Sequence, residues 1–553
     1  MDAAARGHRG ARGVRDRRGA AAFACLLGIA ATTQLDYSPA PGFFDELFEG
    51  PATPRPQTAA LAGALARLGR ERLQSAGERR DAIFVQQGIT FDASTPDGAQ
   101  SRDRPFPLDL VPRILPADEW RVIKRGLAQR VRALNSFVED VYHRQEILKE
   151  RIVPWQLVVT RSHFARQAHG IRPPGGVWCH VSGCDLVRDA DGRWKVLEDN
   201  VRTPSGISYV LENRIAMSRL LPELFAEYDV RPVSNYPALL LEALRASAPS
   251  GGENPVVVVW TPGSANSAYF EHAFLARQMG VELVEASDLV VRDAVCYMRT
   301  TRGLARVDSV YRRIDDDFID PLEFRPDSLL GVAGLMGAYR AGNVGIANAL
   351  GTGVADDKAV YHYVPEMIRF YLSEEPILDN LPTWLLADPE QREYVLDRLH
   401  ELVVKPTGES GGKGVFIGPL ATEEQIEAQK LVLAEAPERW IAQQTVALST
   451  VPTAMPDGSL APRHVDLRPF AVFGEEIKIV PGALTRVALR KGSMIVNSSQ
   501  GGGSKDTWVL AGDPSGGDGG TPAGEFAPPQ LPGLRQAGWR DQQQQQQQAR
   551  SGR

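Results

Sequence analysis

Two side chains with oxygen donors, Glu198 and Asn200, lie two positions apart at the end of an alternating apolar run that begins at Trp194. The alternation predicts a strand, so both side chains point to the same side of it. A carboxylate and an amide on one side suit Mg²⁺, which takes few protein oxygens and completes its shell with water and phosphate. The spacing therefore predicts part of a magnesium site.

A further oxygen donor is expected from Asp185, which lies on the preceding predicted strand, 177–187. The segment 188–192, Arg-Asp-Ala-Asp-Gly, is a turn signal between the two strands and predicts a hairpin. Such a hairpin brings Asp185 alongside Glu198 and gives a metal set of Asp185, Glu198 and Asn200. The alternative is that Asp185 is a surface residue of its strand.

Residue types that bind phosphate occur much later in the chain. The predicted strand 402–406 carries Lys405, and the loop after it contains Gly411, Gly412 and Lys413. The loop is not a Walker A motif, because Lys413 is followed by Gly414 instead of Ser or Thr, and a strand follows instead of a helix. A glycine loop between two strands can still lie over a triphosphate, with its backbone N–H groups and Lys413 on the phosphates. Lys405 would then contact the inner phosphates, and the alternative is a plain flexible hairpin.

Other segments are candidates for the remainder of such a site. The predicted strand 440–444 would offer its edge to an adenine, and the run 484–488 places Arg486 where it can hold an outer phosphate. After Asn200 comes the turn Thr203-Pro204-Ser205-Gly206, followed by a predicted helix, 207–220. The first N–H groups of that helix favour an anion, and Thr203 and Ser205 are candidate substrate contacts.

The surrounding pattern alternates between helices and strands. A helical stretch is predicted at 57–82, a strand at 84–91, and a long helical region at 117–150 with one buried face. That face is formed by Trp120, Ile123, Leu127, Val131, Leu134, Val138 and Val141. The segment 255–289 predicts a βαβ unit without the GxGxxG fingerprint of dinucleotide binding. Asp315, Asp316 and Asp317 are either a metal-binding cluster or, as such runs more often are, a solvated turn.

Composition limits the class of protein. The chain has 553 residues, 43% hydrophobic and 24% charged, with a net charge of −6, which suggests two or three soluble domains and gives no sign of nucleic-acid binding. Four cysteines form neither a disulfide framework nor a CxxC pair. Cys179, His180 and Cys184 lie close together, but zinc usually requires four ligands. We therefore expect a cytoplasmic protein that binds neither nucleic acid nor membrane.

The two ends of the chain have a different composition. An arginine-rich stretch and a short apolar run, 20–31, imitate a secretory signal, but the run is too short to span a bilayer. We interpret the N-terminus as a disordered or misassigned extension. The Gly/Pro-rich C-terminal stretch with glutamines 542–548 is predicted to be a disordered tail.

The lysine strand, the glycine hairpin and the E-x-N pair together resemble the ATP-grasp superfamily, with the order of the two halves exchanged. Segments 212–225, 261–276, 310–321, 342–368 and 496–510 resemble the circularly permuted ATP-grasp type 2 family. The run Glu-Asp-Asn-Val-Arg-Thr-Pro at 198–204 is similar to the E-x-N-x-x-T-P of glutathionylspermidine synthetase, a carboxylate–amine ligase. The resemblance covers roughly residues 33–510.

This resemblance implies a permuted ATP-grasp fold of the α+β or α/β class, with a Rossmann-like βαβ pre-ATP-grasp substrate domain. The implied domains are an extension 1–36, a mostly helical region 37–150, a metal-binding part 151–250, an α/β domain 251–355, a phosphate- and adenine-binding part 356–510 and a tail 511–553.

The same resemblance implies an ATP-dependent, Mg²⁺-requiring ligase that forms a C–N bond between a small-molecule or peptide carboxylate and an amine through an acyl phosphate. It assigns Gln444 to the adenine hinge. It also assigns to Arg202 and Arg486 the neutralisation of charge on the transferring phosphoryl group. The alternatives are a phosphotransferase with a non-acyl acceptor and a non-catalytic nucleotide-binding scaffold. The identities of the acid and amine and the oligomeric state stay open.

Overall fold

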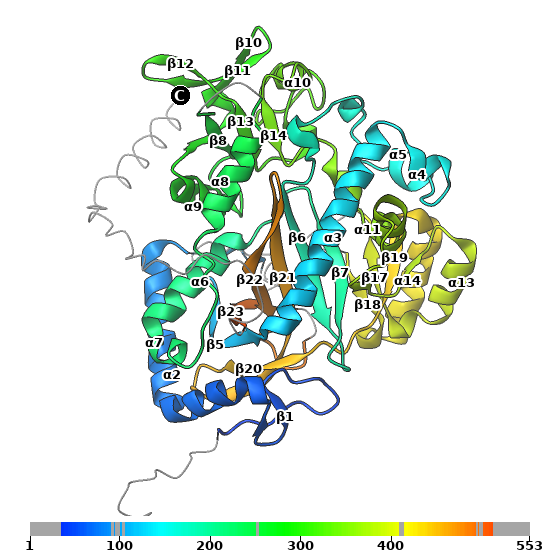
Figure 1. The fold of residues 1–553 in the computed structure, drawn as a ribbon. Helices are drawn as coiled ribbons and strands as arrows, with labels where there is room; N and C mark the ends of the chain where they lie inside the picture. The colour runs from blue at the N-terminus through cyan, green and yellow to red at the C-terminus, as the bar shows by residue number, and fades with distance from the viewer. Residues whose placement is uncertain are drawn as a thin grey trace, which may run out of the picture. The chain divides into compact units, whose positions relative to one another are not determined.

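A mixed sheet of eight strands forms the centre of the part of the chain described by the computed structural model (Figure 1). The description covers residues 35–89, 93–94, 100–101, 105–249, 254–408, 414–493, 496 and 502–512, without side chains at 93–94 and 100–101. The strand order is β15-β7-β6-β21-β22-β23-β5, with β20 paired to β21. The bounds are β5 (Leu108–Leu115), β6 (Val181–Arg188), β7 (Trp194–Asn200), β15 (Asp379–Asn380), β20 (Thr450–Ala454), β21 (Leu460–Phe473), β22 (Ile477–Val487) and β23 (Gly503–Val509).

The predicted long helix is α3 (Ala117–Tyr142), which packs on β21 and β22 (Figure 1). All seven residues of the predicted apolar face are buried, so this prediction is confirmed. Arg130 of the same helix is also buried and donates three hydrogen bonds of 2.7–2.9 Å to Asp199 on β7. Because side chains alternate along a strand, Asp199 points away from its neighbours Glu198 and Asn200 and anchors β7 to the helix.

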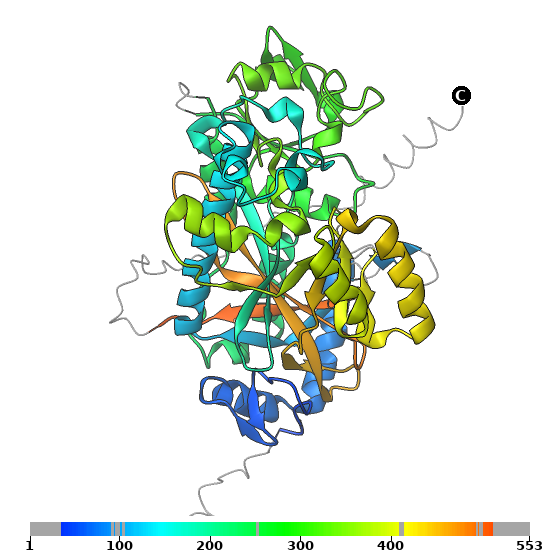
Figure 2. The ribbon, with the colours of Figure 1, turned by 90° about the vertical axis from the view of Figure 1, so that its right-hand side faces the viewer.

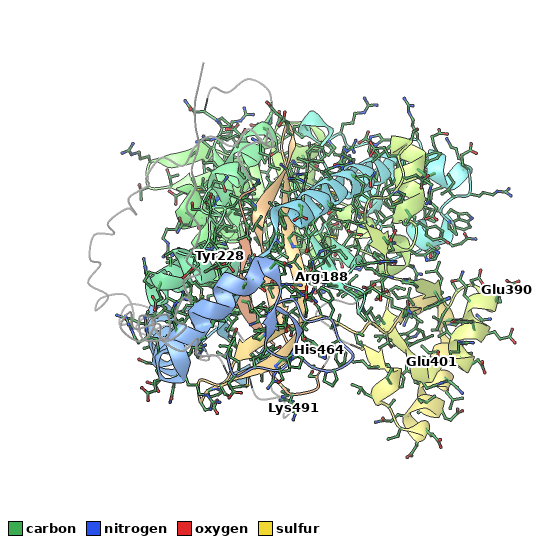
Figure 3. The ribbon with its side chains drawn as sticks, turned by 60° about the horizontal axis from the view of Figure 1, so that its bottom comes forward. Arg188, Tyr228, Glu390, Glu401, His464 and Lys491 are labelled. Atoms are coloured by element: carbon green, nitrogen blue, oxygen red, sulfur yellow. The ribbon has the colours of Figure 1, made fainter. Side chains whose placement is uncertain are left out.

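A small antiparallel sheet lies beside the edge of the large sheet that carries β7 and β15 (Figures 1 and 2). Its order is β16-β19-β17-β18, with bounds β16 (Thr383–Leu385), β17 (Leu402–Pro406), β18 (Phe416–Ile417) and β19 (Trp440–Gln444). The chain passes from β15 of the large sheet to β16 of the small sheet through Leu381 and Pro382 alone. Helices α13 (Pro389–Asp397) and α14 (Glu423–Glu435) belong to this layer. Glu390 and Glu401 are exposed on its outer side (Figure 3).

The predicted βαβ unit belongs to a third sheet, which is entirely parallel, with the order β14-β13-β8-β9. Its strands are β8 (Val257–Trp260), β9 (Glu282–Val284), β13 (Ser309–Arg312) and β14 (Gly345–Ala347), and α9 (Tyr269–Met279) connects β8 to β9. The apolar β8 is buried at all four positions, as expected for a central parallel strand. A separate hairpin sheet contains β10 (Leu289–Arg292), β11 (Val295–Thr300) and β12 (Gly303–Arg306).

The predicted strand 84–91 is wrong, because the helix α2 (Ala59–Gln87) continues as far as Gln87 and no strand is formed at the described residues 84–89. The helix ends at Gly88, whose backbone is left-handed (φ 67°) and whose N–H donates to the carbonyls of Phe84 and Val85. This is a glycine helix stop that the apolar pattern of the segment concealed. The remaining helices are α4 (Glu146–Lys149), α5 (Gln156–Val159), α6 (Ile207–Leu220), α7 (Pro222–Phe225), α8 (Tyr236–Ala246), α10 (Leu335–Arg340), α11 (Lys358–Tyr361) and α12 (Val364–Met367).

The described residues contain no helix long and apolar enough to cross a membrane. The remaining short strands are β1 (Phe48–Gly50) with β2 (Thr53–Pro54), and β3 (Ala93–Ser94) with β4 (Gln100–Ser101). The predicted N-terminal extension, apart from 35–36, and the predicted tail, apart from 511–512, lie outside the described residues.

Arg113 of β5 is expected to be a strong determinant of stability. It is fully buried and donates to both carboxylate oxygens of Glu46, at 2.7 and 2.6 Å, and to the carbonyl of Asp466. Arg113→Leu leaves the Glu46 charge buried without its partner, so we expect the free energy of unfolding in urea to fall by about 3–5 kcal/mol. Arg132→Leu is the control, because its pair with Glu374 is exposed and contributes at most about 1 kcal/mol. Equal losses in the two variants would contradict this prediction.

Candidate active site

A cavity of about 420 Å³ lies between β6, β7, β21 and β22 of the large sheet and β17 and β19 of the small one. Its lining brings together charged residues that are far apart in the sequence. They include Asp185, Glu198, Arg202, Asp356, Lys358, Lys405, Asp466, Arg468 and Arg486. The predicted metal ligands therefore line the same cavity as Lys405, the lysine predicted to contact phosphate.

The predicted hairpin is confirmed, since β6 and β7 are antiparallel and Asp185 lies directly opposite Glu198. The register shifts by one residue between Asp185 and Leu186, so that Leu197 forms a bulge in β7. A bulged residue leaves the regular ladder. The carbonyl of Leu197 accepts a hydrogen bond from Gln443 of the small sheet at 3.3 Å. The bulge thus links the two walls of the cavity.

Asp185 is held by two arginines. Its Oδ2 accepts from Arg468 Nη2 at 2.8 Å and from Arg486 Nη2 at 2.6 Å. Burial alone would raise the pKa of Asp185, but the two guanidinium groups outweigh it and hold that pKa well below its usual range. Arg486 also donates from Nε to both oxygens of Asp466, at 2.9 Å each. At this end of the cavity the pKa of Asp185 is lowered, whereas burial outweighs the charge of Arg486 and raises the pKa of Asp466.

Glu198 and Asn200 are held less tightly. The two oxygens of Glu198 lie 3.7 Å from Arg468 Nη2 and 3.7 Å from Lys358 Nζ, which is longer than a direct hydrogen bond. The side-chain nitrogen of Asn200 is buried without a hydrogen-bond partner in the described part of the chain. Both side chains therefore retain bonding capacity.

Lys405 faces this group from β17. Its ammonium donates to Gln443 Oε1 at 2.6 Å, and Gln443 is held in turn by Thr383 and by the carbonyl of Leu197. Burial, opposed by the charge of Glu198, lowers the pKa of Lys405 to about 8. Gln443 on the neighbouring strand β19 thus positions Lys405. With a pKa of about 8, the lysine loses its charge within one unit of neutral pH.

This lowered pKa predicts a pH-dependent affinity for a nucleoside triphosphate. Phosphates favour the charged lysine, so binding of a non-hydrolysable ATP analogue should weaken as the pH rises above about 8, by up to about tenfold per unit. Calorimetry in buffers of different ionisation enthalpy should detect proton uptake that rises from near zero at pH 7 toward one at higher pH. Lys405→Met should remove this slope, and Lys478→Met, an exposed lysine on β22, should keep it. An unchanged slope in Lys405→Met would contradict the prediction.

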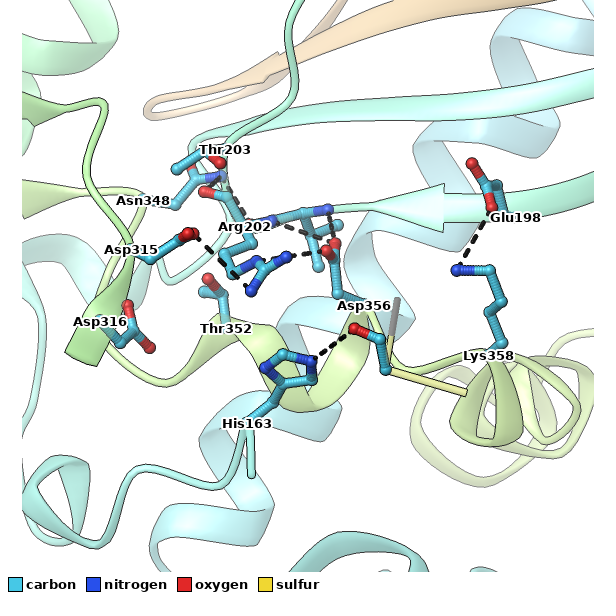
Figure 4. A network of polar contacts seen from close by, with 12 residues as sticks. His163, Glu198, Arg202, Thr203, Asp315, Asp316, Asn348, Thr352, Asp356 and Lys358 are labelled. Carbon is cyan, nitrogen blue, oxygen red and sulfur yellow. Dashed lines mark hydrogen bonds and ion pairs between the residues drawn. The ribbon is translucent and has the colours of Figure 1, made fainter. Parts of the chain in front are cut away.

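Arg202 lies at one end of the cavity, between Asp356 and Asp315 (Figure 4). Its Nε is 3.6 Å from Asp356 and its Nη1 is 3.7 Å from Asp315. Asp356 also accepts from the backbone N–H groups of Val201 and Arg202, at 2.5 and 3.2 Å. Burial alone would lower the pKa of Arg202, but the neighbouring carboxylates outweigh it and raise that pKa. Arg202 therefore stays charged.

The turn after β7 differs from the prediction in one respect. The first N–H groups of α6, which were expected to favour an external anion, already bind the carboxylate of Glu271 from α9. Glu271 accepts from the backbone of Gly206 at 2.7 Å and of Ser208 at 3.1 Å. Gly206 is required there, because its φ is 115° and an added Cβ would meet Leu484 at 2.8 Å. Thr203 and Ser205 line the cavity, and Ser205 Oγ accepts a hydrogen bond from Arg313.

The remaining predicted residues are placed as follows. Gln444 lines the cavity, and its backbone N–H already donates to the carbonyl of Pro382 at 3.0 Å, so its place at an adenine stays a prediction. Gly411, Gly412 and Lys413 lie outside the described residues. Cys179 and Cys184 are buried thiols whose pKa values are raised by burial. Within the described ranges, no three His, Cys, Asp or Glu side chains are grouped to hold a metal, so neither this cluster nor Asp315–Asp317 forms such a site.

Several lining residues were not predicted from the sequence. Asp466 and Arg468 lie two apart on the predicted strand 465–473, and this alternation was a usable signal, because both had to point to one side. No comparable sequence pattern indicated the other lining residues Asp356, Lys358, His163 and Gln443. They reach the cavity only because loops and the small sheet fold against β7.

Residues 112–488 match the family model for circularly permuted ATP-grasp type 2. An uncharacterized protein of Synechocystis is 55% identical over 85% of this chain and 97% of its own length. A Mycobacterium tuberculosis protein, also uncharacterized, is 53% identical over 85% of this chain and 84% of its own.

A Frankia alni protein, provisionally named glutamate–cysteine ligase 2-3, is 48% identical over 85% of this chain, and the match spans only 54% of the Frankia protein. Among solved structures, an effector of Globodera pallida described as glutathione synthetase-like matches with a TM-score of 0.53. It covers 80% of this chain and 98% of the effector at 11% identity, so this similarity concerns the fold alone.

Proposed function

Because this chain belongs to the circularly permuted ATP-grasp type 2 family, we propose that it is an ATP-dependent ligase that joins a carboxylate to an amine. The family and the provisional name of the Frankia relative support an ATP-dependent ligase in general. The observation that supports the proposal for this chain is the shared cavity, whose lining contains Glu198 and Asn200 of β7 together with Lys405 of β17. Its volume of about 420 Å³ is in the ordinary range for small-molecule sites.

Phosphoryl transfer depends on positioning and charge neutralisation, and needs no nucleophile from the protein. In the proposed complex, Lys405 and Lys358 hold the phosphates of ATP from the side of the small sheet and α11. Arg468 and Arg486 lie on the opposite wall, where they stabilise the charge that spreads over the transferring group. Arg202 at the end of the cavity orients the substrate carboxylate.

The oxygen donors fit a hard divalent cation such as Mg²⁺. The described ion pairs of Glu198 are both long, so its carboxylate has capacity for a ligand, and Asn200 would contribute its amide oxygen, because its unpartnered atom is the nitrogen, a donor. Asp185 would join them on exchanging one of its arginine contacts. When bound with ATP, such an ion withdraws charge from the outer phosphates. The metal roles of Asp185, Glu198 and Asn200 are part of this proposal.

The proposed reaction has two steps. An oxygen of the substrate carboxylate forms a bond to the γ-phosphorus, and the bond from that phosphorus to the ADP oxygen breaks. The amine nitrogen then forms a bond to the acyl carbon, phosphate leaves, and the amine releases a proton. The products are an amide, ADP and phosphate.

Hydroxylamine trapping tests this function. Purified protein with Mg²⁺, ATP and a pool of carboxylic acids is expected to release ADP and, with hydroxylamine, to yield a hydroxamate. ADP release without a hydroxamate would indicate phosphoryl transfer to a non-acyl acceptor. Binding of an ATP analogue without any ADP release from a broad pool of acids and amines would contradict the ligase and favour a nucleotide-binding role.

A further inference from the structure

The proposed reaction requires a base, because most amines are ammonium ions at neutral pH and an ammonium nitrogen has no free electron pair. A general base must lie within hydrogen-bond reach of the proton that it removes. It therefore needs an acceptor atom that faces the cavity and is not already held by a donor of the protein. In the described part of the chain, the carboxylates that line the cavity are Asp185, Glu198, Asp199, Asp356 and Asp466.

Most of these carboxylates are already engaged. Asp185, Asp199 and Asp466 accept hydrogen bonds of 2.6–2.9 Å from arginine side chains. Glu198 is a metal ligand in the proposed function. The comparison leaves Asp356 as the lining carboxylate without a role in the reaction.

Asp356 is fixed through one of its two oxygens. Its Oδ1 accepts from the backbone N–H groups of Val201 and Arg202, at 2.5 and 3.2 Å, so the carboxylate is tied to the end of β7. Its Oδ2 makes no hydrogen bond with any residue that the structure describes, and its ion pair with Arg202 Nε is 3.6 Å long (Figure 4). The side chain is 17% exposed and lines the cavity. Oδ2 is thus an acceptor in a fixed position that is available to a ligand.

The surroundings make Asp356 a stronger base than an ordinary aspartate. Burial raises the pKa of Asp356 and outweighs the opposing charges of Arg202 and of Lys358 on α11, while the charge of Glu198 adds to the increase. His163, in the same lining, contacts a backbone carbonyl at 3.2 Å. A carboxylate with a raised pKa holds a transferred proton more readily.

We propose that Asp356 is the general base of the ligation and accepts a proton from the ammonium form of the amine. This inference rests on the proposed function and adds the residue that prepares the nucleophile. Because Arg202 orients the substrate carboxylate in the proposed function, a nitrogen that attacks the acyl carbon there lies beside Asp356.

The nitrogen loses two protons in this step. An N–H bond of the ammonium breaks and an O–H bond forms on Asp356 Oδ2, which leaves the nitrogen with an electron pair. That pair forms the bond to the acyl carbon, the bond from this carbon to the phosphate oxygen breaks, and the phosphate leaves with its electrons. The second proton passes from the nitrogen to the departing phosphate, and Asp356 returns its proton to water.

The test compares two kinds of nucleophile, because hydroxylamine is largely uncharged at neutral pH and attacks without first losing a proton. The full-length protein receives Mg²⁺, ATP and a pool of carboxylic acids, with either hydroxylamine or a pool of ammonia, alkylamines and amino acids. Asp356→Asn should lower amide formation from the amine pool by about a hundredfold or more, and hydroxamate formation by less than about threefold. Raising the pH to about 9 supplies more neutral amine, so in this variant amide formation should recover relative to hydroxamate formation.

Asparagine retains an oxygen for the N–H groups of Val201 and Arg202, so the variant is expected to fold. Asp356→Ser also lacks the carboxylate and should show the same selective loss, which keeps the test decisive if Asp356→Asn does not fold. Asp357→Asn is the matched control. Asp357 is buried and accepts from the backbone N–H of Ala359 at 2.8 Å, but it does not line the cavity, so its variant should keep the ratio of the two activities.

An equal loss of both activities in Asp356→Asn, or unchanged amide formation, would overturn the proposal. It would also be overturned if the unaltered protein formed hydroxamates but no amide from the amine pool. Each of these results leaves the acyl phosphate and the ligase function standing. An unaltered protein that released no ADP and formed no hydroxamate would instead contradict the ligase function itself, and the role of Asp356 with it.

Discussion

Glu198→Gln is expected to lower ATP-dependent ADP release at least about a thousandfold, while the protein remains folded. Glutamine preserves the size of the side chain but removes the charge that faces Arg468, Lys358 and Lys405. Since the ion pairs of Glu198 with described residues are 3.7 Å long, its loss should change the melting temperature little. Turnover should be measured with saturating ATP, together with the dependence of nucleotide affinity on Mg²⁺, which the variant is expected to lose.

Glu242→Gln is the control for this experiment, because Glu242 is an exposed carboxylate that pairs with the exposed Lys478 at 3.3 Å. Its activity and its Mg²⁺ dependence should match those of the unaltered protein. A Glu198→Gln variant that kept full activity would contradict the placement of the metal at β7. Loss of folding in that variant would indicate that Glu198 has a structural role.

Arg486→Gln is expected to have the largest effect on stability within the site. Arg486 is buried and is shared by Asp466 and Asp185, both of which are also buried. Removing it leaves two carboxylates facing each other with only Arg468 between them, which should cost about 3–5 kcal/mol of unfolding free energy. Urea denaturation monitored by tryptophan fluorescence should show this loss.

A second substitution separates stability from chemistry. In the double variant Arg486→Gln with Asp466→Asn, the uncompensated charge is gone, so we expect most of the stability to return. ADP release should nevertheless stay about a hundredfold low, because the charge that stabilises the transferring phosphoryl group is still missing. Recovery of activity along with stability would mean that Arg486 supports the sheet and takes no part in the reaction.

The sequence was sufficient for those parts of the site that are carried by regular strands. Asp185 and Glu198 could be paired because a hairpin with a clear turn signal has a register that alternation determines. The bulge at Leu197 could not be anticipated, because a bulge depends on how the strand fits its neighbours and has no fixed residue signature. For the same reason, the bond from Gln443 to the Leu197 carbonyl appears only in three dimensions.

The N-terminus of α6 shows why local signals mislead. The Ser205-Gly206 turn correctly predicted where the helix begins, and free N–H groups at such a terminus do favour an anion. The anion is an internal one, Glu271, which is 65 residues away from Gly206 in the chain. Local chemistry predicted the kind of partner, whereas its identity depended on how α9 packs against α6.

The exchanged order of the two halves of the ATP-grasp fold also affects how the chain folds during synthesis. In the large sheet, β5 pairs with β23 and β6 pairs with β21, so that Asp185 and Arg468, which are bonded, are 283 residues apart. During synthesis, β5 and β6 are therefore completed long before their partner strands leave the ribosome. Contacts of such sequence separation form late and slowly, and unpaired strand edges are prone to aggregation. We expect fragments that end before Leu460 to be insoluble, and this protein to depend on chaperones until its last strand is complete.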